Sequence, residues 1–221
     1  MSDFLQAAAG NYKAGRSLLI NYIVIHYTAN NGDTAAGNAK YFHNNKNLKA
    51  SAHYFVDEKE VWQAVREGDT AYHCGGGLQG TGGHAFYGLC SNGNSIGIEL
   101  CSRKDARGRY YFKEETLENA AELARGLMKK YGIPAGRVIR HYDVTGKICP
   151  APLVDRGKWL QFKARLEDKE VEKQQKIKLN GKEKTVHVIE KNGYNYVKLQ
   201  DLRDERIEIS YDGVPVVRVI K

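Results

Sequence analysis

The chain has 221 residues, a mean hydropathy of −0.56 and a formal net charge of +8 at pH 7. It contains no run of about 18 apolar residues, which excludes a membrane-spanning helix, and it is long enough for one substantial core and a small second module. Nearly all of the excess positive charge falls in the first 165 residues. No recognition helix, RNP motif or zinc-finger spacing accompanies this charge, so we expect no nucleic-acid partner.

The N-terminal residues 1–10 lack a basic start and a long apolar stretch, so we expect no secretory signal there. The first predicted strand covers residues 21–28 and carries His26 near its end, where α/β sheets commonly present catalytic groups. A histidine in this place can also be a hydrogen-bonded structural residue. A helix is predicted over residues 33–45, with Asp33 as a candidate N-cap.

Two further strands are predicted over residues 52–57 and 60–65. His53 and Tyr54 are neighbours in the first of them, so strand alternation points their side chains to opposite faces. The glycine-rich residues 75–88 lack the GK[ST] ending of a phosphate-binding loop. We interpret them as a mobile loop at the edge of a groove.

A strand over residues 94–101 is mostly apolar but carries Glu99 near its end. This carboxylate either faces solvent at a sheet edge or faces a cleft, where it can accept a proton. A helix is predicted over residues 114–131, ending before Gly132, and a strand is predicted over residues 137–141.

The segment RHYDVTGKICP, residues 140–150, concentrates reactive side chains in a short loop. His141 and Cys149 are eight residues apart, and imidazole nitrogen and thiolate sulfur are ligands that suit zinc. With His26 they make a three-ligand set that leaves the fourth position of a catalytic zinc site for water. Lys147 would oppose the charge of a metal ion, so it fits a site where negative charge develops during a reaction. The pattern therefore favours hydrolysis over a purely structural metal site.

The C-terminal part changes character after a last predicted helix near residues 155–168. This helix is expected to pack on the sheet through four side chains, Trp159, Leu160, Phe162 and Leu166. Residues 167–175 are highly charged and mark a linker. The chain is thus predicted to be an α/β domain with a mixed central sheet flanked by helices over residues 1–166, followed by a second domain over residues 176–221.

This second domain is predicted to be small and mainly antiparallel. Its short β-prone runs are separated by three hairpin-type dipeptides, Asn180-Gly181, Asn192-Gly193 and Asp212-Gly213. A short helical turn is expected around residues 199–203.

The motifs of the first domain resemble those of the zinc-dependent N-acetylmuramoyl-L-alanine amidases. In chain order they are IVIHYTAN, SAHYFVDEKEVWQAV, AYHCGG, SIGIEL and RHYDVTGKICPAP. This order is typical of the type-2 amidase family, which includes phage endolysins and is related to peptidoglycan recognition proteins. The resemblance covers residues 21–166, roughly two thirds of the chain.

The resemblance implies a reaction and a set of residue roles. His26, His141 and Cys149 would bind a zinc ion, and the enzyme would hydrolyse the amide that joins N-acetylmuramic acid to the first L-alanine of the stem peptide. Glu99 would transfer the proton, and Lys147 would stabilise the oxyanion of the intermediate.

Two further histidines are expected to bind substrate. His73, in AYHCG, resembles a position that lines the substrate groove, with structural packing as an equal alternative. His53 stands where some phage amidases have a functional tyrosine, so the chain departs from that branch. We therefore assign proton transfer to Glu99 and treat His53 as a secondary pocket residue, with a hydrogen-bonded core histidine as the alternative.

The resemblance also suggests partners and location. Peptidoglycan is the expected partner, and its anionic polymers would be attracted by the basic first domain. Without a signal, a wall-lytic enzyme is expected to be made in the cytoplasm and to reach the wall through holin pores or lysis, as phage endolysins do; a bacterial autolysin is the other possibility. The second domain loosely resembles β modules of Firmicute wall enzymes, so we expect wall binding, with oligomerisation or stabilisation as alternatives.

The remaining cysteines and the competing function complete the prediction. Cys74, Cys90 and Cys101 are expected to stay reduced in a cytoplasmically made protein, while a Cys90–Cys101 bridge is left open. The competing function is a protein that binds muropeptides without cutting them. Such relatives typically lose the cysteine ligand, so the presence of Cys149 together with Glu99 favours the enzyme.

Overall fold

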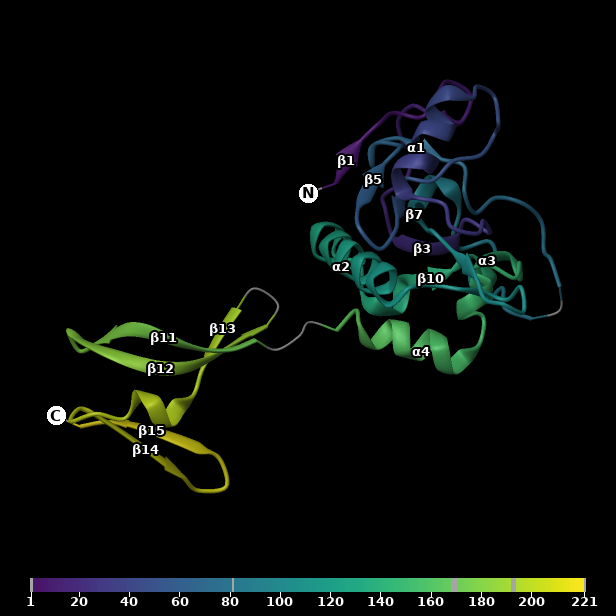
Figure 1. Ribbon diagram of the computed structural model, residues 1–221. Helices are drawn as coiled ribbons and strands as arrows, with labels where there is room; N and C mark the ends of the chain where they lie inside the picture. Colours follow the sequence, from purple (N-terminus) through teal and green to yellow (C-terminus); the bar gives the residue numbers. More distant parts are fainter. Residues whose placement is uncertain (1, 81, 168–170, 192–193, 221) are drawn as a thin grey trace. The chain divides into compact units, whose positions relative to one another are not determined.

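The computed structural model describes residues 2–80, 82–167, 171–191 and 194–220. The chain divides into two compact units, Met1–Glu167 and Asp168–Lys221 (Figure 1). Within the described residues, no helix is both long enough and apolar enough to cross a bilayer.

The first unit is built on a mixed β-sheet. From one edge to the other, its strands are β1 (Asp3–Phe4), β5 (Val61–Gln63), β4 (Tyr54–Val56), β7 (Ser95–Leu100), β3 (Tyr22–Tyr27) and β10 (Val138–Arg140) (Figure 1). β3 pairs in parallel with both β7 and β10, and β4 pairs in parallel with β7 but antiparallel with β5. The predicted α/β class with a mixed central sheet is therefore confirmed. Two short pairs lie outside this sheet, β2 (Tyr12–Lys13) with β6 (Thr70–Ala71) and β8 (Arg103–Lys104) with β9 (Tyr110–Tyr111).

Helices cover both faces of the sheet. They are α1 (Ala35–Asn44), α2 (Glu114–Tyr131), α3 (His141–Thr145) and α4 (Arg156–Ala164), with 3₁₀ turns η1 (Asn92–Asn94), η2 (Ala135–Arg137) and η3 (Ala151–Leu153). Figure 1 shows α2 and α4 on one side of the sheet and α1 on the other. Ile23 and Ile25 of β3 pack in the core shared with α2 and α4. Val24 belongs to a separate cluster with Val144 of α3, because successive strand residues point to opposite faces.

The helices differ from the predictions at two residues, the N-cap of α1 and Leu160 of α4. Thr34, rather than Asp33, caps α1, because its hydroxyl accepts the Gly37 N–H at 3.0 Å. As predicted, α2 ends before Gly132, its C-cap residue, which has a left-handed φ of 64°. Leu160 of α4 is 56% exposed instead of packing on the sheet, since it lies two residues from the buried Phe162 and so on nearly the opposite side of the helix.

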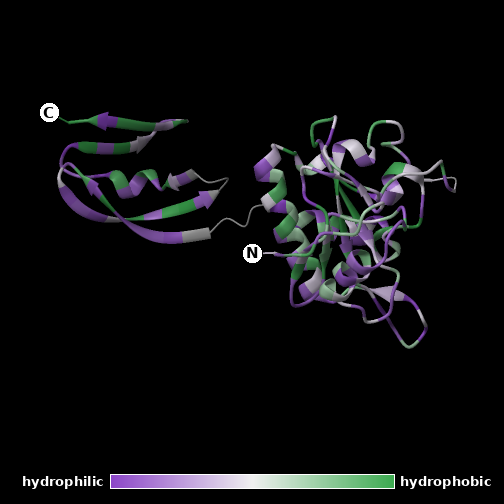
Figure 2. Cartoon of the chain, turned by 90° about the horizontal axis from the view of Figure 1, so that it is seen from above, coloured by the Kyte–Doolittle hydropathy of each residue, from purple (hydrophilic) through white to green (hydrophobic). Residues whose placement is uncertain are grey.

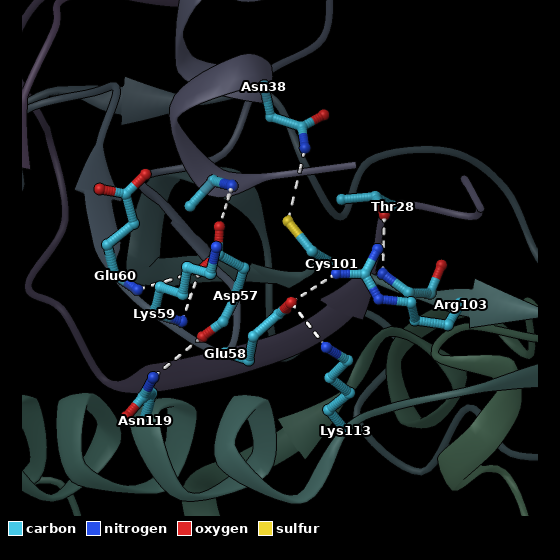
Figure 3. A network of polar contacts seen from close by, with 12 residues as sticks. Thr28, Asn38, Asp57, Glu58, Lys59, Glu60, Cys101, Arg103, Lys113 and Asn119 are labelled. Carbon is cyan, nitrogen blue, oxygen red and sulfur yellow. Dashed lines mark hydrogen bonds and ion pairs between the residues drawn. The ribbon is translucent and has the colours of Figure 1, made fainter. Parts of the chain in front are cut away.

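A buried carboxylate organises the turn that follows β4 (Figure 3). Asp57 is 2% exposed, and its Oδ1 accepts the backbone N–H groups of Lys59 at 2.7 Å and Glu60 at 2.9 Å. Its Oδ2 accepts the N–H of Ala35 at the start of α1 at 2.8 Å. The side chain of Asn119 in α2 donates to the Asp57 carbonyl at 2.9 Å. One residue thus ties helices on both faces of the sheet to the end of β4.

The second unit is antiparallel β structure, as expected. β11 (Val171–Leu179), β12 (Lys182–Lys191) and β13 (Tyr194–Val197) form one sheet, η4 (Leu199–Leu202) follows, and β14 (Ile207–Tyr211) pairs with β15 (Pro215–Val219). Asn180-Gly181 joins β11 to β12 with φ of 49° and 82°, the positive pair that a type I′ hairpin turn requires. Asp212-Gly213 joins β14 to β15. The predicted Asn192-Gly193 turn lies outside the described residues.

The boundary of this unit differs from the prediction. β11 begins at Val171, so residues 171–175 belong to the first hairpin rather than to a linker. Residues 173–176 are exposed, so hydrophilic side chains suit a strand here, and Figure 2 shows hydrophilic colouring along much of this strand. The apolar interior of the unit includes Val186, Val188 and Ile209. This charged run therefore belongs to a solvent-facing strand. Charge alone does not distinguish such a strand from a linker, because both are exposed to water.

Candidate metal centre

Three adjacent strands bring the candidate residues together. His26 in β3 is the register partner of Glu99 in β7. On the other side, Arg140 at the end of β10 is the register partner of Ile25, so the next residue, His141, comes level with His26. Because these strands are parallel, their carboxyl ends lie at the same edge of the sheet.

Cys149 completes a cluster of potential metal ligands. One ligand atom each from His26, His141 and Cys149 lies within 4.8 Å of the others, and all three residues are buried. Cys149 Sγ lies 3.6 Å from His26 Nδ1. Both ring nitrogens of His141 are buried without a hydrogen-bond partner among the described residues. Buried imidazole nitrogens normally have partners, so this observation fits a place for a metal ion between the three side chains, called the metal triad below.

Burial sets the protonation state of the metal triad. It lowers the pKa of His26 well below its ordinary value, and it lowers the pKa of His141 to about 4, a shift to which the charge of Lys147 adds. Both imidazoles are therefore neutral at pH 7, as metal binding requires. Burial also raises the pKa of the Cys149 thiol to about 12, so the thiolate forms at neutral pH only when a cation offsets the cost. Two imidazoles and one thiolate fit a divalent cation of borderline softness.

The loop that carries Cys149 is closed by backbone contacts. The Tyr142 N–H donates to the Cys149 carbonyl at 2.8 Å, and the Cys149 N–H donates to the Lys147 carbonyl at 2.6 Å. α3 ends at Gly146, whose φ is 80°. A Cβ on Gly146 would lie 1.9 Å from the Gln79 carbonyl oxygen, so a side chain is excluded by conformation and by space.

The glycine-rich loop is tied to α3. Three of its backbone N–H groups donate to carbonyls of that helix: Gln79 to Thr145 at 2.6 Å, His84 to Tyr142 at 3.0 Å and Phe86 to Asp143 at 2.8 Å. These contacts attach the described residues on both sides of position 81 to α3. The mobility of this loop and its place at the edge of a groove stay predictions.

Glu99 faces the same space as the metal triad. It lies on the side of β7 opposite Ile98 and Leu100, and its Oε2 is buried without a partner among the described residues. Burial raises its pKa to about 8, while the charge of Lys147 acts in the opposite direction. Glu99 as a residue is partly exposed, although its Oε2 is buried.

Lys147 is an exposed residue of the loop between α3 and Cys149. Its charge lowers the pKa of Glu99 and of both histidines of the metal triad, so its ammonium group lies within electrostatic range of all of them. The structure therefore brings together the five residues predicted for catalysis and metal binding.

His53 is placed differently from the expectation that it contacts substrate. It is fully buried, its Nδ1 accepts the Gly97 N–H at 3.0 Å, and its Nε2 lies against Arg16 and 3.3 Å from the Asp69 carbonyl oxygen. Burial lowers its pKa well below the ordinary value. These contacts make it a core histidine, which corrects its assignment as a substrate-binding residue.

His73 lies against the metal triad. Its Nδ1 is 3.0 Å from His26 Nε2, and the two rings are nearly perpendicular with centroids 5.1 Å apart. Its backbone N–H donates to Asn92 Oδ1 at 2.9 Å, and the N–H of Cys74 donates to the same oxygen at 2.8 Å. His73 as a residue is partly exposed.

Several supporting residues carried no signal in the sequence. Arg16 donates to the carbonyls of Glu67 at 2.6 Å and Ser95 at 2.9 Å, although it lies far from both along the chain. Ser95, at the start of β7, contacts His73. Their partners become visible only when the chain is folded.

The four cysteines are all free. Cys74, Cys90 and Cys101 are buried, and Cys90 and Cys101 belong to different hydrophobic clusters, so the structure contains no bridge between them. Cys90 instead shares its cluster with Cys74.

This fold and donor set define a class: an α/β protein with a mixed sheet, at whose carboxyl edge two buried histidines and a buried cysteine form a candidate metal site beside a carboxylate. Residues 15–152 match the family model described as N-acetylmuramoyl-L-alanine amidase, Amidase_2. This match covers more than half of the chain, and the chain belongs to that family.

Individual relatives agree with the family match. The chain is 40% identical over 143 residues to the N-acetylmuramoyl-L-alanine amidase CwlL of Bacillus licheniformis, which covers 60% of this chain and 36% of CwlL. It is 35% identical over 155 residues to CwlA of Bacillus subtilis, which covers 70% of this chain and 52% of CwlA. The catalytic domain of XlyA, an amidase of Bacillus subtilis, is similar in structure with a TM-score of 0.58 and 30% identity, over 74% of this chain and 99% of that domain. The chain thus spans only 36% and 52% of the lengths of CwlL and CwlA.

Proposed function

We propose that this chain is a zinc-dependent N-acetylmuramoyl-L-alanine amidase that hydrolyses the amide between N-acetylmuramic acid and L-alanine in peptidoglycan. The observation that carries the proposal is the buried metal triad with Glu99 beside it in register. Membership of the amidase family supplies the bond and the substrate class. The proposed biological role is cell-wall lysis, as an endolysin or an autolysin.

Zinc is the metal that the donors suit best. Neutral imidazoles and a thiolate are its usual ligands, and three protein ligands leave one coordination position open, as catalytic zinc sites do. A bound zinc ion supplies Lewis acidity, which polarises a carbonyl group and lowers the pKa of water. His26, His141 and Cys149 would hold the ion.

Glu99 is the proposed proton carrier. Water adds to the amide carbon, and the carboxylate takes up the proton that the water loses. The protonated carboxyl group then gives this proton to the nitrogen as the carbon–nitrogen bond breaks, which releases the amine of L-alanine and a carboxylate on the muramic acid. A pKa raised to about 8 by burial suits a group that must both accept and return a proton near neutral pH.

Lys147 is the proposed partner of the oxyanion. Its exposed ammonium group lies within electrostatic range of Glu99 and the metal triad, where negative charge develops on the amide oxygen. His73 is the remaining candidate for substrate contact, because this residue is partly exposed whereas His53 is buried. Anionic wall polymers are further proposed partners of the basic first unit, and wall binding is the proposed role of the second.

Digestion of purified sacculi tests the proposal. We expect new N-terminal alanine, identified by end-group labelling, without new reducing sugar ends. New reducing ends would mean glycosidase activity and would contradict the proposal. If the zinc-loaded protein binds sacculi but releases no new ends, this result would support the competing function of a non-catalytic muropeptide-binding protein.

A further inference from the structure

A chain of hydrogen bonds runs from the metal triad through the buried Ser95 to the backbone of Ser91. His26 Nε2 lies 3.0 Å from His73 Nδ1, and His73 Nε2 lies 3.2 Å from Ser95 Oγ. Ser95 Oγ donates to the carbonyl oxygen of Ser91 at 2.5 Å. At the other end, the second nitrogen of His26, Nδ1, faces Cys149 Sγ at 3.6 Å.

The direction of each bond follows from the last acceptor. A carbonyl oxygen can only accept, so Ser95 gives its single hydroxyl proton to Ser91. The Ser95 oxygen must then accept from His73, which places the proton of neutral His73 on Nε2. His73 Nδ1 is left as an acceptor, so His26 donates to it from Nε2. The lone pair of His26 Nδ1 is thereby left free on the side of Cys149.

We infer that His73 and Ser95 are positioning residues that hold the proton of His26 on Nε2 and so present its Nδ1 lone pair to the metal ion. The inference rests on the proposed function only in treating the metal triad as a metal site. Histidine ligands commonly donate their second N–H to a carboxylate, a carbonyl or water, which fixes the tautomer. In this chain an imidazole, oriented by a serine, takes that place.

The surrounding packing supports a fixed orientation for His73. Ser95 is fully buried, and the backbone on either side of the imidazole is held by Asn92 through the N–H groups of His73 and Cys74. The ring lies so close to β7 that a Cβ on Gly97 would be 2.5 Å from its Cγ. Glycine at position 97 therefore makes room for the ring. Cys74 Sγ, 3.6 Å from Ser95 Oγ, is a weak partner and does not compete with the Ser91 carbonyl.

The tautomers can be read directly in the metal-free full-length protein. Long-range ¹H–¹⁵N correlation spectra of the imidazole groups at pH 8 should show His26 protonated on Nε2 with a bare Nδ1, and His73 likewise. In Ser95→Ala, the His73 Nε2–H loses its acceptor, so both histidines should show mixed tautomers. A wild-type spectrum with the proton of His26 on Nδ1 would overturn the inference, and so would an unchanged spectrum in Ser95→Ala.

Zinc affinity provides a second, independent measurement, with Zn²⁺ alone as the probe in competition with a chromogenic chelator. His73→Leu removes the acceptor and should weaken zinc binding about 10- to 100-fold. His73→Asn places an amide oxygen near the former Nδ1 and should recover most of that loss. If the role of His73 were purely structural, both variants would lower the stability of the metal-free protein, and His73→Asn would not bind zinc more tightly than His73→Leu.

The outcomes separate this inference from the proposed function. If the wild-type protein binds no zinc, the proposed function fails. If the wild type binds zinc and His73→Leu binds it equally well, only the positioning role is refuted. Should His73→Leu not fold, the spectra of the wild type and of Ser95→Ala still decide the question.

Discussion

Within the metal triad, His141 and Cys149 are the two donors whose buried side chains most need a metal ion. His141 has no other partner among the described residues for either nitrogen, and Cys149 ionises at neutral pH only with a cation beside it. Without a metal ion these groups are buried at a cost, so the ion should contribute directly to the stability of the folded chain.

We expect one zinc ion per chain in the wild type, and loss of both zinc and activity in His141→Ala and in Cys149→Ala. Metal analysis after gel filtration checks the first point, and release of N-terminal alanine from sacculi checks the second. Cys101→Ala, which removes a buried cysteine outside the metal triad, serves as the control and should keep its zinc. Chelation should lower the melting temperature of the wild type, because a ligand that binds only the folded state stabilises it. Normal zinc content and turnover in either triad variant would reject the ligand set.

Proton transfer can be separated from metal binding at Glu99. Glu99→Gln keeps the size of the side chain but cannot accept a proton, so turnover should fall on the order of 10² to 10⁴-fold while zinc content is unchanged. Kinetics on soluble muropeptides with parallel metal analysis measure both quantities. Activity close to that of the wild type would assign the base role to a second water instead.

Among the structural elements, the C-terminal end of α2 is tied to the sheet by the carboxylate of Glu67. Glu67 receives hydrogen bonds from the Tyr54 hydroxyl of β4 and from Lys130 and Tyr131 at the end of α2. Burial by itself raises the pKa of Glu67, but these three hydrogen bonds outweigh it and hold the pKa below its ordinary value. The ionised form is therefore favoured in the folded state.

Stability should depend on Glu67 in a pH-dependent way. A depressed folded-state pKa contributes stability above the unfolded pKa of about 4.3, and this contribution is lost as the pH falls through the lower folded value. Glu67→Gln should thus cost about 1–3 kcal/mol at pH 7 and less at pH 3, because pH 3 lies below the unfolded pKa and part of the contribution is already lost there. Urea unfolding at both pH values measures the difference. The exposed Glu122→Gln on the same helix is the matched control, and an equal loss at both pH values in Glu67→Gln would contradict the argument.

At the scale of the whole molecule, the chain consists of two compact units, and we expect these units to have separate roles. All residues of the metal centre belong to the first unit, which ends at Glu167 after the buried Leu166. The second unit has an apolar interior of its own, which includes Val186 and Ile209. Each unit thus has the minimum that an independent fold needs.

Truncation after Glu167 should leave a folded amidase that binds zinc. Retention on intact walls should fall on the order of a hundredfold. The truncated chain lacks the proposed wall-binding site of the second unit, and with it the effective-concentration advantage of a tethered second site. Activity on small soluble muropeptides should hardly change, since the centre is untouched. Sedimentation with sacculi and kinetics on soluble substrate measure the two effects. An equal loss on both substrates would mean that the second unit stabilises the first or holds an oligomer together.

Much of this organisation was readable from local patterns. Strand periodicity around His26 and Glu99, the spacing of His141 and Cys149, and the Asn180-Gly181 turn depend on neighbours in the chain, so the α/β class, the candidate ligands and the first hairpin could be predicted. Local patterns also misled where charge was the only signal, since residues 171–175 form part of a strand rather than a linker.

The sequence by itself therefore determined which residues are candidates for the chemistry, while the tertiary structure decided what surrounds them. His53 and His73 look equally available in the sequence. Folding buries His53 among Arg16, Gly97 and Asp69, and it places His73 between His26 and Ser95. Both outcomes depend on contacts between residues that are separated by 16 to 79 positions along the chain. Arg16 makes two of these contacts, with His53 and with Ser95. Such contacts leave no periodic trace, because the burial of a side chain is set by the elements that pack over it and not by its neighbours in sequence.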